Sequence, residues 1–209
     1  MSRYSAAYTN PRGINDARPT AMQMIHDEQV EDKLVGKAVV ITGVSFGLGV
    51  ETARALAATD ASLYLTARDL DRAKNALGPS DNYHYQKGGY DPGAAYCQSK
   101  LANVYMANEI ERRYGSQGLH ATSLNPGIVA TSLMRHMSEA ELEALLQNPV
   151  VQKYQKSPEQ GAATTVWGAV SQELEGKGGL FLDNCAVAAR GDYDKNPFER
   201  ECGAPYLLP

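Results

Sequence analysis

Residues 37–56, KAVVITGVSFGLGVETARAL, join a short apolar run to a glycine-spaced turn and then to an amphipathic segment. The β-branched residues at 39–41 follow one another without alternation, which is typical of a strand buried on both faces of a parallel sheet. Apolar residues then recur at helical spacing over residues 50–57. The stretch therefore predicts a strand, a turn and a helix in succession.

The turn has the pattern T-G-x-x-x-G-x-G. Glycines lack a Cβ atom, so the backbone can bend tightly and approach a phosphate. Free N–H groups and the dipole at the start of a helix favour negative charge there. The pattern predicts binding of a dinucleotide pyrophosphate, although taken alone it also fits an ordinary strand-to-helix turn. The candidate cofactor-binding residues in this turn are Gly43, Ser45, Gly47, Leu48 and Gly49.

Length and composition limit the class of protein. A chain of 209 residues is most simply one domain, 1–209. The formal net charge of −4 and the absence of long basic runs do not favour nucleic acid as a partner. Cys97, Cys185 and Cys202 form no C-x-x-C pair, so we expect neither a zinc site nor a disulfide framework. The sequence has no apolar run of membrane-spanning length and no signal-peptide core, so we expect a soluble, cytoplasmic protein without a membrane partner.

The end of the second predicted strand, residues 62–67, bears on the choice of cofactor. In dinucleotide-binding folds an acid at this point binds the ribose hydroxyls of NAD, whereas a nearby arginine can pair with the 2′-phosphate of NADP. Here Ala67 takes the place of the acid and Arg68 follows it. The sequence therefore favours NADP(H) over NAD(H), with Arg68 as a ligand. The alternative is that Arg68 pairs with Asp69 or Asp71 at the surface.

Tyr96 and Lys100 are the candidate catalytic pair. They fall in a predicted helix over residues 94–114, which Asp91 and Pro92 would begin. Their i, i+4 spacing puts both side chains on one face, one turn apart. A phenol titrates near pH 10, and a neighbouring ammonium favours the phenolate, which draws the pKa toward the working range. Alone, the spacing also fits an exposed pair without a catalytic role.

A third motif, NPGIVAT at residues 125–131, follows a predicted strand over 119–124. Together, the glycine turn, Tyr-x-x-x-Lys and P-G-x-x-x-T resemble the short-chain dehydrogenase/reductase family, in particular its retinol-dehydrogenase-like members from fungal biosynthetic pathways. The resemblance implies an α/β, Rossmann-like, doubly wound parallel sheet. It also implies that Tyr96 exchanges a proton with the substrate oxygen and that Lys100 binds the nicotinamide ribose. Val129 and Thr131 would hold the nicotinamide carboxamide.

This resemblance implies an NADP(H)-dependent oxidoreductase that interconverts a carbonyl and an alcohol on a small, secondary-metabolite substrate. The sequence departs from the family between residues 78 and 95, which are polar and glycine-rich where further β-α units are expected. The family's N-A-G motif, a structural asparagine and the catalytic serine are all missing. Loss of one oxygen-binding donor typically lowers turnover by about 10²- to 10³-fold. A non-redox isomerase or cyclase and an inactive remnant of the family are the alternatives.

The missing block also affects the expected sheet. The family's strand order, 3-2-1-4-5-6-7, would be reduced to the pairs 2-1 and 6-7. Either the sheet closes in the order 2-1-6-7, or the free edges pair with another chain, or the fold is only marginally stable. Oligomerisation through these edges or through the Tyr96 helix is therefore an expectation.

The flanking regions give weaker signals. Residues 1–20 are polar, contain two prolines and predict a loose N-terminal arm. Ser138 and Glu141 form a capping box within residues 132–157, which we interpret as a substrate lid. Ser157 and Gln160 begin a further helix, and residues 179–183 predict the last strand.

Overall fold

The computed structural model describes residues 3–42, 47–66, 92–131 and 137–188. The helices are α1 (Ser5–Thr9), α2 (Ala21–Asp27), α3 (Leu48–Ala57), α5 (Pro92–Tyr114), α6 (Glu139–Gln147), α7 (Pro149–Tyr154) and α8 (Pro158–Val170), with short 3-10 turns η1 (Gly115–Gln117) and η3 (Gln172–Leu174). The strands are β1 (Ala38–Thr42), β2 (Ser62–Thr66), β3 (Thr122–Asn125), β4 (Leu180–Asp183) and β5 (Ala186–Val187). A helix that the sequence predicts over residues 69–77, after the second strand, lies outside the described residues.

The strand and the helix predicted at residues 37–56 are confirmed by β1 and α3, and β2 completes a parallel β-α-β unit. β3 and β4 form a second parallel pair, to which the short strand β5 adds an antiparallel edge. These are the two pairs that the shortened family order leaves. They belong to separate sheets, β1-β2 and β3-β4-β5, so among the described strands the closed order 2-1-6-7 is not the arrangement adopted.

The described helices cover the first pair of strands on one face only. Ile41 is 8% exposed and Val39 packs against the core, but Val40 between them is 66% exposed. Its partner in register on β2, Tyr64, is 59% exposed. The expectation that residues 39–41 are buried on both faces is therefore wrong, because α2, α3 and α8 all lie on the same side of this pair.

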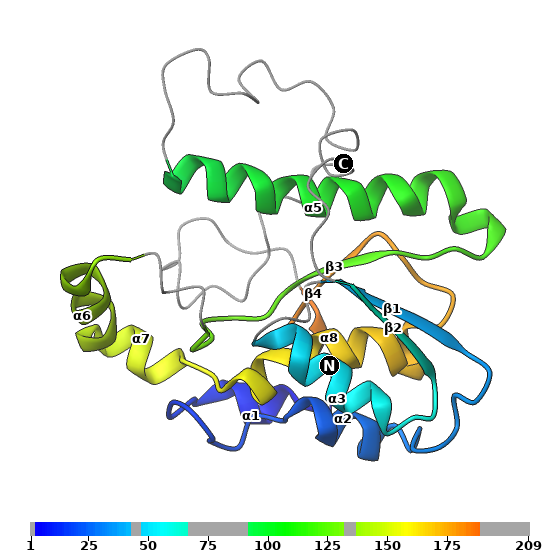
Figure 1. Cartoon of the computed structure of the whole chain (residues 1–209), viewed down its shortest axis with the longest axis horizontal. Coiled ribbons are helices and arrows are strands. Elements are labelled where there is room, and N and C mark those ends of the chain that lie inside the picture. Colours follow the sequence, from blue (N-terminus) through cyan, green and yellow to red (C-terminus); the bar gives the residue numbers. More distant parts are fainter. Residues whose placement is uncertain (1–2, 43–46, 67–91, 132–136, 189–209) are drawn as a thin grey trace, which may run out of the picture.

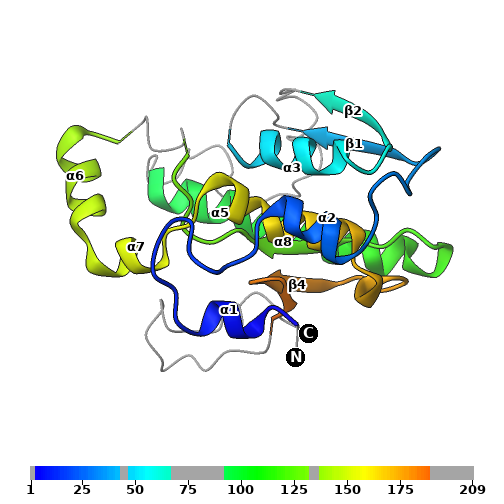
Figure 2. The same cartoon turned by 90° about the horizontal axis from the view of Figure 1, so that it is seen from below.

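The second pair of strands is enclosed. Helix α5 lies across β3 on one side, and α8 packs against β3 and β4 on the other (Figures 1 and 2). Val104 of α5 meets Phe181 of β4 in a small apolar cluster. Strand β3 begins at Thr122, later than the expected residue 119. Just before it, the backbone N–H of Ala121 donates a hydrogen bond to the carboxylate of Glu111 at 3.3 Å.

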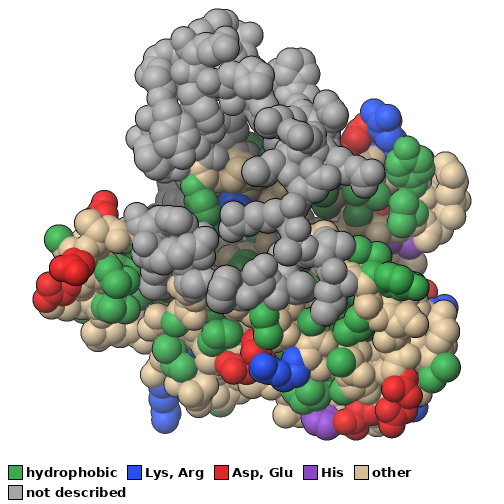
Figure 3. All heavy atoms as spheres, viewed as in Figure 1, with side chains coloured by type: hydrophobic (Ala, Val, Ile, Leu, Met, Phe, Trp, Pro, Cys, Tyr) green, Lys and Arg blue, Asp and Glu red, His purple; other side chains and the backbone are tan. Residues whose placement is uncertain are grey.

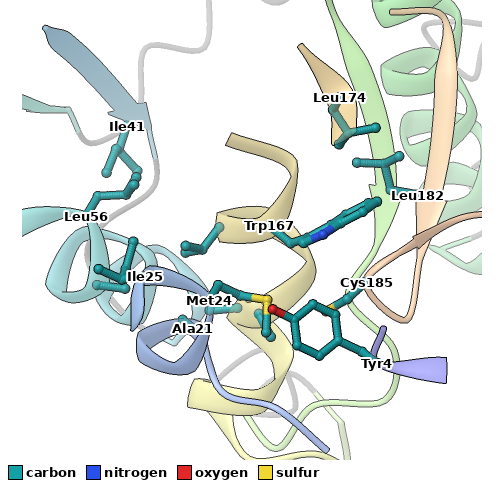
Figure 4. Packing of buried hydrophobic residues seen from close by; sticks show 14 residues of the cluster. Tyr4, Ala21, Met24, Ile25, Ile41, Leu56, Trp167, Leu174, Leu182 and Cys185 are labelled. Carbon is teal, nitrogen blue, oxygen red and sulfur yellow. The ribbon is translucent and has the colours of Figure 1, made fainter. Parts of the chain in front are cut away.

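The main core is centred on Trp167 of α8, which is 1% exposed (Figure 4). Met24 and Ile25 of α2 contribute fully buried side chains, and Leu182 of β4 closes the core from the strand side. Large apolar side chains buried to this extent each stabilise a fold by about 1.5–3 kcal/mol. Both capping boxes predicted from sequence are present, at the starts of α6 and α8.

The N-terminal segment is packed, in contrast to the expected loose arm. Tyr4 is 8% exposed and belongs to the main core. Arg18 is 3% exposed and its guanidinium donates hydrogen bonds to the carbonyl oxygens of Tyr154 at 2.9 Å and Gln155 at 2.7 Å. The segment is ordered by these distant partners, which its own polar composition does not reveal.

The surface of the described part is mixed. On the face shown in Figure 3, acidic and basic side chains are dispersed among apolar and polar ones. None of the helices in the described ranges combines the length and the hydrophobicity that a bilayer span requires.

Candidate active site

The glycine turn enters α3 through Gly47, the N-cap residue, whose φ of 61° lies in the left-handed region that glycine adopts without strain. Its carbonyl accepts hydrogen bonds from the backbone N–H groups of Val50 and Glu51. A Cβ atom at Gly47 would lie 3.0 Å from Cγ2 of Thr131. Gly47 and Thr131 are 84 positions apart in sequence, so the glycine turn and P-G-x-x-x-T, two separate motifs, meet in the structure.

Helix α8 packs against both of these motifs through Gly161. A Cβ atom at Gly161 would lie 2.7 Å from Leu48 Cδ2 and 2.6 Å from Val129 Cγ2. Leu48 of the glycine turn and Val129 of the third motif thus both rest on the bare backbone of α8. The structure brings Gly47, Leu48, Val129 and Thr131 together as one group, with Gly49 in the first turn of α3.

The third motif is shaped by a polar turn at the end of β3. The side-chain oxygen of Asn125 accepts a hydrogen bond from the N–H of Gly127 at 3.0 Å, and its amide donates to Asp183 at 3.2 Å. Gly127 has a φ of 86°, which favours glycine. The turn is therefore tied to the end of β4, the strand beside β3.

Tyr96 and Lys100 lie together on α5, as their spacing predicts. The Lys100 ammonium is 5.1 Å from the centre of the Tyr96 ring, and Tyr96 is 50% exposed. The hydroxyl of Ser99 donates to the carbonyl oxygen of Tyr96 at 2.7 Å. The helix is held to β3 about two turns further along, where Val104 and Ala107 are buried. The pair is thus positioned by α5, and its phenol is accessible.

Ser80, Ser99 and Ser123 carry hydroxyls that could stand in for the missing catalytic serine, and no described hydrogen bond joins Ser99 or Ser123 to the phenol of Tyr96. The Ser99 hydroxyl is used by its own helix. Thr122 faces Gly168 of α8, so Ser123, the next residue of the strand, faces α5. Its hydroxyl is buried there and has no hydrogen-bond partner among the described residues. Ser80 lies outside the described residues.

Three predicted cofactor residues, Gly43, Ser45 and Arg68, also lie outside the described residues, so the structure does not test the preference for NADP(H). The described part holds no cluster of three or more His, Cys, Asp or Glu side chains able to bind a metal ion.

Sequence reasoning missed one residue beside the site. Lys156, in the link between α7 and α8, is 3% exposed and its ammonium donates to the carbonyl of Pro126 at 3.1 Å. Lys156 belongs to no recognised motif. The one sequence signal near it is the capping box that begins at Ser157, and that signal concerns the helix rather than the lysine.

Comparison with known proteins places this geometry in context. No model of a known protein family matches the chain. The chain is 30% identical to the short-chain dehydrogenase/reductase prx1 of Penicillium roqueforti over 288 aligned positions, which span 89% of this chain and 85% of that protein. It is 34% identical to retinol dehydrogenase 13 of Mus musculus over 105 residues, which span 49% of this chain and 31% of that protein.

The first alignment also bears on the missing block. Its 288 positions exceed the 209 residues of the chain by 79, so at least that many positions face a gap in this chain. This supports the interpretation that an internal segment of the relatives is absent here.

Among solved structures, a short-chain type dehydrogenase/reductase from Mycobacterium marinum superposes with a TM-score of 0.50 at 14% identity, covering 75% of this chain and 96% of that one. At this level of identity the likeness concerns the fold alone, and it confirms the predicted Rossmann-like α/β class.

Proposed function

The chain belongs to the short-chain dehydrogenase/reductase family, and we propose that it is an NADP(H)-dependent oxidoreductase that interconverts a carbonyl and an alcohol on a small molecule. The observation that carries this proposal is the contact between Gly47 and Thr131, because it joins the pyrophosphate turn to the segment that would hold the nicotinamide. A secondary metabolite is the substrate class that the resemblance to enzymes of fungal biosynthetic pathways suggests.

The described residues fit such a cofactor. Gly47 presents backbone without a side chain, and the first turn of α3 offers the N–H groups of Leu48 and Gly49 together with the positive end of the helix dipole. Val129 and Thr131 stand beside this turn, where they would contact the nicotinamide carboxamide. When bound, the nicotinamide ring supplies or accepts the hydride.

The proton is assigned to Tyr96. In the reducing direction the Tyr96 phenol donates a proton to the substrate oxygen as the carbonyl carbon receives the hydride. The Lys100 ammonium lies 5.1 Å from the centre of the Tyr96 ring and would bind the nicotinamide ribose. Because the family's serine, an oxygen-binding donor, is missing from the sequence, we expect slow turnover.

Helix α6 supports the proposed substrate lid, residues 132–157. It is a well-capped helix, but none of its residues is buried. Leu146 is 43% exposed and Leu142 and Leu145 are only half-buried. These leucines form an apolar surface that a substrate could cover.

The first test is calorimetric titration of the purified protein with NADPH and NADH. We expect NADPH to bind more tightly, and Arg68→Ala to weaken NADPH binding by about 10- to 100-fold, because the arginine makes charge-assisted hydrogen bonds to the 2′-phosphate. NADH affinity should not change in this variant. A protein that unfolds cooperatively yet binds neither nucleotide would overturn the proposal in favour of a non-redox or inactive protein.

A second prediction concerns the contact behind the site. Gly161→Ala should weaken NADPH binding by about tenfold or more, because the new methyl would push Leu48 and Val129 apart, and overpacking of this kind costs about 1–3 kcal/mol. The matched control is Gly168→Ala, on the same helix, whose methyl would meet Leu182 instead. Equal NADPH affinities in the two variants, measured by titration, would contradict the assignment of Leu48 and Val129 to the cofactor site.

A further inference from the structure

The link between α7 and α8 is paired with the third motif through its backbone. The N–H of Lys156 donates to the carbonyl of Ile128 at 2.8 Å, and the N–H of Ala130 donates to the carbonyl of Lys156 at 3.3 Å. These two bonds form an isolated parallel bridge between Lys156 and Val129. The segment that carries Val129 and Thr131 therefore has Lys156 as its neighbour.

The side chain of Lys156 fills the inside of the same turn. Its ammonium donates to the carbonyl of Pro126 and to the side-chain oxygen of Asn184, both at 3.1 Å. A Cβ atom at Gly127 would lie 2.9 Å from the Lys156 ammonium, so the glycine leaves the space that the lysine occupies. The ring of Tyr8 covers the ammonium at 5.1 Å.

The ammonium is one member of a closed hydrogen-bond network at the ends of β3 and β4. Asn184, which Lys156 contacts, donates from its amide to Asp183 at 3.0 Å. Asp183 accepts from the amide of Asn125, whose oxygen in turn accepts from the N–H of Gly127. The network returns to the Lys156 side chain through the Pro126–Gly127 turn.

A buried lysine is costly unless it is hydrogen-bonded and its charge is compensated. Burial lowers the pKa of Lys156, and the carboxylate of Asp183 opposes that shift. The network supplies two oxygen acceptors and a nearby carboxylate: the carbonyl of Pro126 lies at the turn before Val129 and Thr131, and Asn184 and Asp183 lie at the end of β4. The hydrogen bond from the Lys156 ammonium to the Pro126 carbonyl forms only when the turn keeps its present conformation, so the lysine and the turn stabilise each other.

We infer that Lys156 is a positioning residue for the nicotinamide-binding segment, which it fixes by holding the Pro126–Gly127 turn to the end of β4. This inference rests on the proposed function, because Val129 and Thr131 are the residues that it positions. It adds to the proposed function a second lysine, distinct from Lys100. This lysine does not contact the cofactor itself but positions the backbone of the segment that would bind it.

The test compares Lys156→Met, which keeps the length of the side chain and removes its charge, with Lys153→Met, which alters an exposed lysine of α7. The probes are NADPH and 2′,5′-ADP, which lacks the nicotinamide half. Lys156→Met should weaken NADPH binding about tenfold, as expected for loss of hydrogen bonds from a charged group, and leave 2′,5′-ADP binding unchanged. Lys153→Met should leave both unchanged. Equal weakening of both probes by Lys156→Met would show a general structural role and overturn the inference.

Hydrogen exchange of the peptide that covers residues 127–131 gives a readout without any cofactor. In the Lys156→Met variant the amide hydrogen of Ala130 should exchange faster than in the wild type, because its N–H donates to the backbone carbonyl of residue 156. Unchanged exchange at Ala130 would overturn the inference about Lys156, whether or not the protein binds NADPH. Absence of NADPH binding by the wild-type chain would instead refute the proposed function. If Lys156→Met does not fold, Asn184→Gly removes one partner of the ammonium and suits the left-handed backbone at that position, and the same outcomes apply to it.

Discussion

Replacement of Tyr96 by phenylalanine is expected to lower kcat for carbonyl reduction by about 10²- to 10⁴-fold, the usual contribution of a positioned acid–base group. Phenylalanine keeps the ring beside Lys100 and removes only the hydroxyl that would carry the proton. NADPH affinity should therefore stay within about twofold of the wild-type value, since the loss falls on the transition state. The measurement is NADPH consumption with a panel of carbonyl compounds, together with NADPH titration of both proteins.

Tyr105→Phe is the matched control, because Tyr105 lies on the same helix and is 47% exposed, close to the 50% of Tyr96. It should retain wild-type turnover. A Tyr96→Phe variant that is as active as the Tyr105→Phe variant would remove Tyr96 from the mechanism. It would leave the helix motif as an exposed pair on the surface of α5.

Local signals in the sequence predicted local structure well. The glycine turn is followed by α3 as expected, and the capping boxes at Ser138 and Ser157 each begin a helix. In each of these cases the interaction that determines the structure joins residues only a few positions apart, so the pattern itself contains both partners.

Burial was harder to predict because it depends on what covers each face. The apolar run of β1 looks like a strand covered on both sides, yet Val40 and Tyr64 are exposed where no described helix covers them. The same limit applies to the N-terminal segment. Arg18 is ordered by carbonyl oxygens more than 130 residues away, and no pattern within residues 1–20 records them.

The candidate site likewise contains residues that the sequence predicted and one that it did not. The motifs named Gly47, Leu48, Val129 and Thr131. The structure brings Gly47 beside Thr131 and places both Leu48 and Val129 against Gly161. Lys156 could not be found from the sequence, because a single lysine before a capping box gives no sign that its side chain is buried. Its role follows from its contacts with Pro126 and Asn184, which only the tertiary structure brings within reach.

Arg18→Met should lower the free energy of unfolding by about 3–5 kcal/mol, the typical cost of breaking a buried ion pair by removing one partner. The guanidinium pairs with Asp16 at 2.8 Å, and the two side chains are 2% and 9% exposed. It also donates to the carbonyls of Gly13, Tyr154 and Gln155, which methionine would leave without this donor. Urea unfolding of both proteins measures the difference. The control is Arg54→Met, because Arg54 is paired with Glu51 across one turn of α3 but is 61% exposed, so its loss should cost less than about 0.5 kcal/mol.

The dependence of this loss on pH separates the ion pair from simple packing. Burial alone would raise the pKa of Asp16, but hydrogen bonds from the Arg18 side chain and from the backbone N–H of Arg12 and Arg18 lower it below its ordinary value. A carboxyl group with a lowered pKa adds stability above its ordinary pKa, and that stability is lost as the pH falls through the lowered value. The gap between wild type and Arg18→Met should therefore narrow in acid, where Asp16 becomes protonated. A gap that stays constant from neutral to acidic pH would assign the effect of Arg18 to packing and to its carbonyl contacts, and not to its pairing with Asp16.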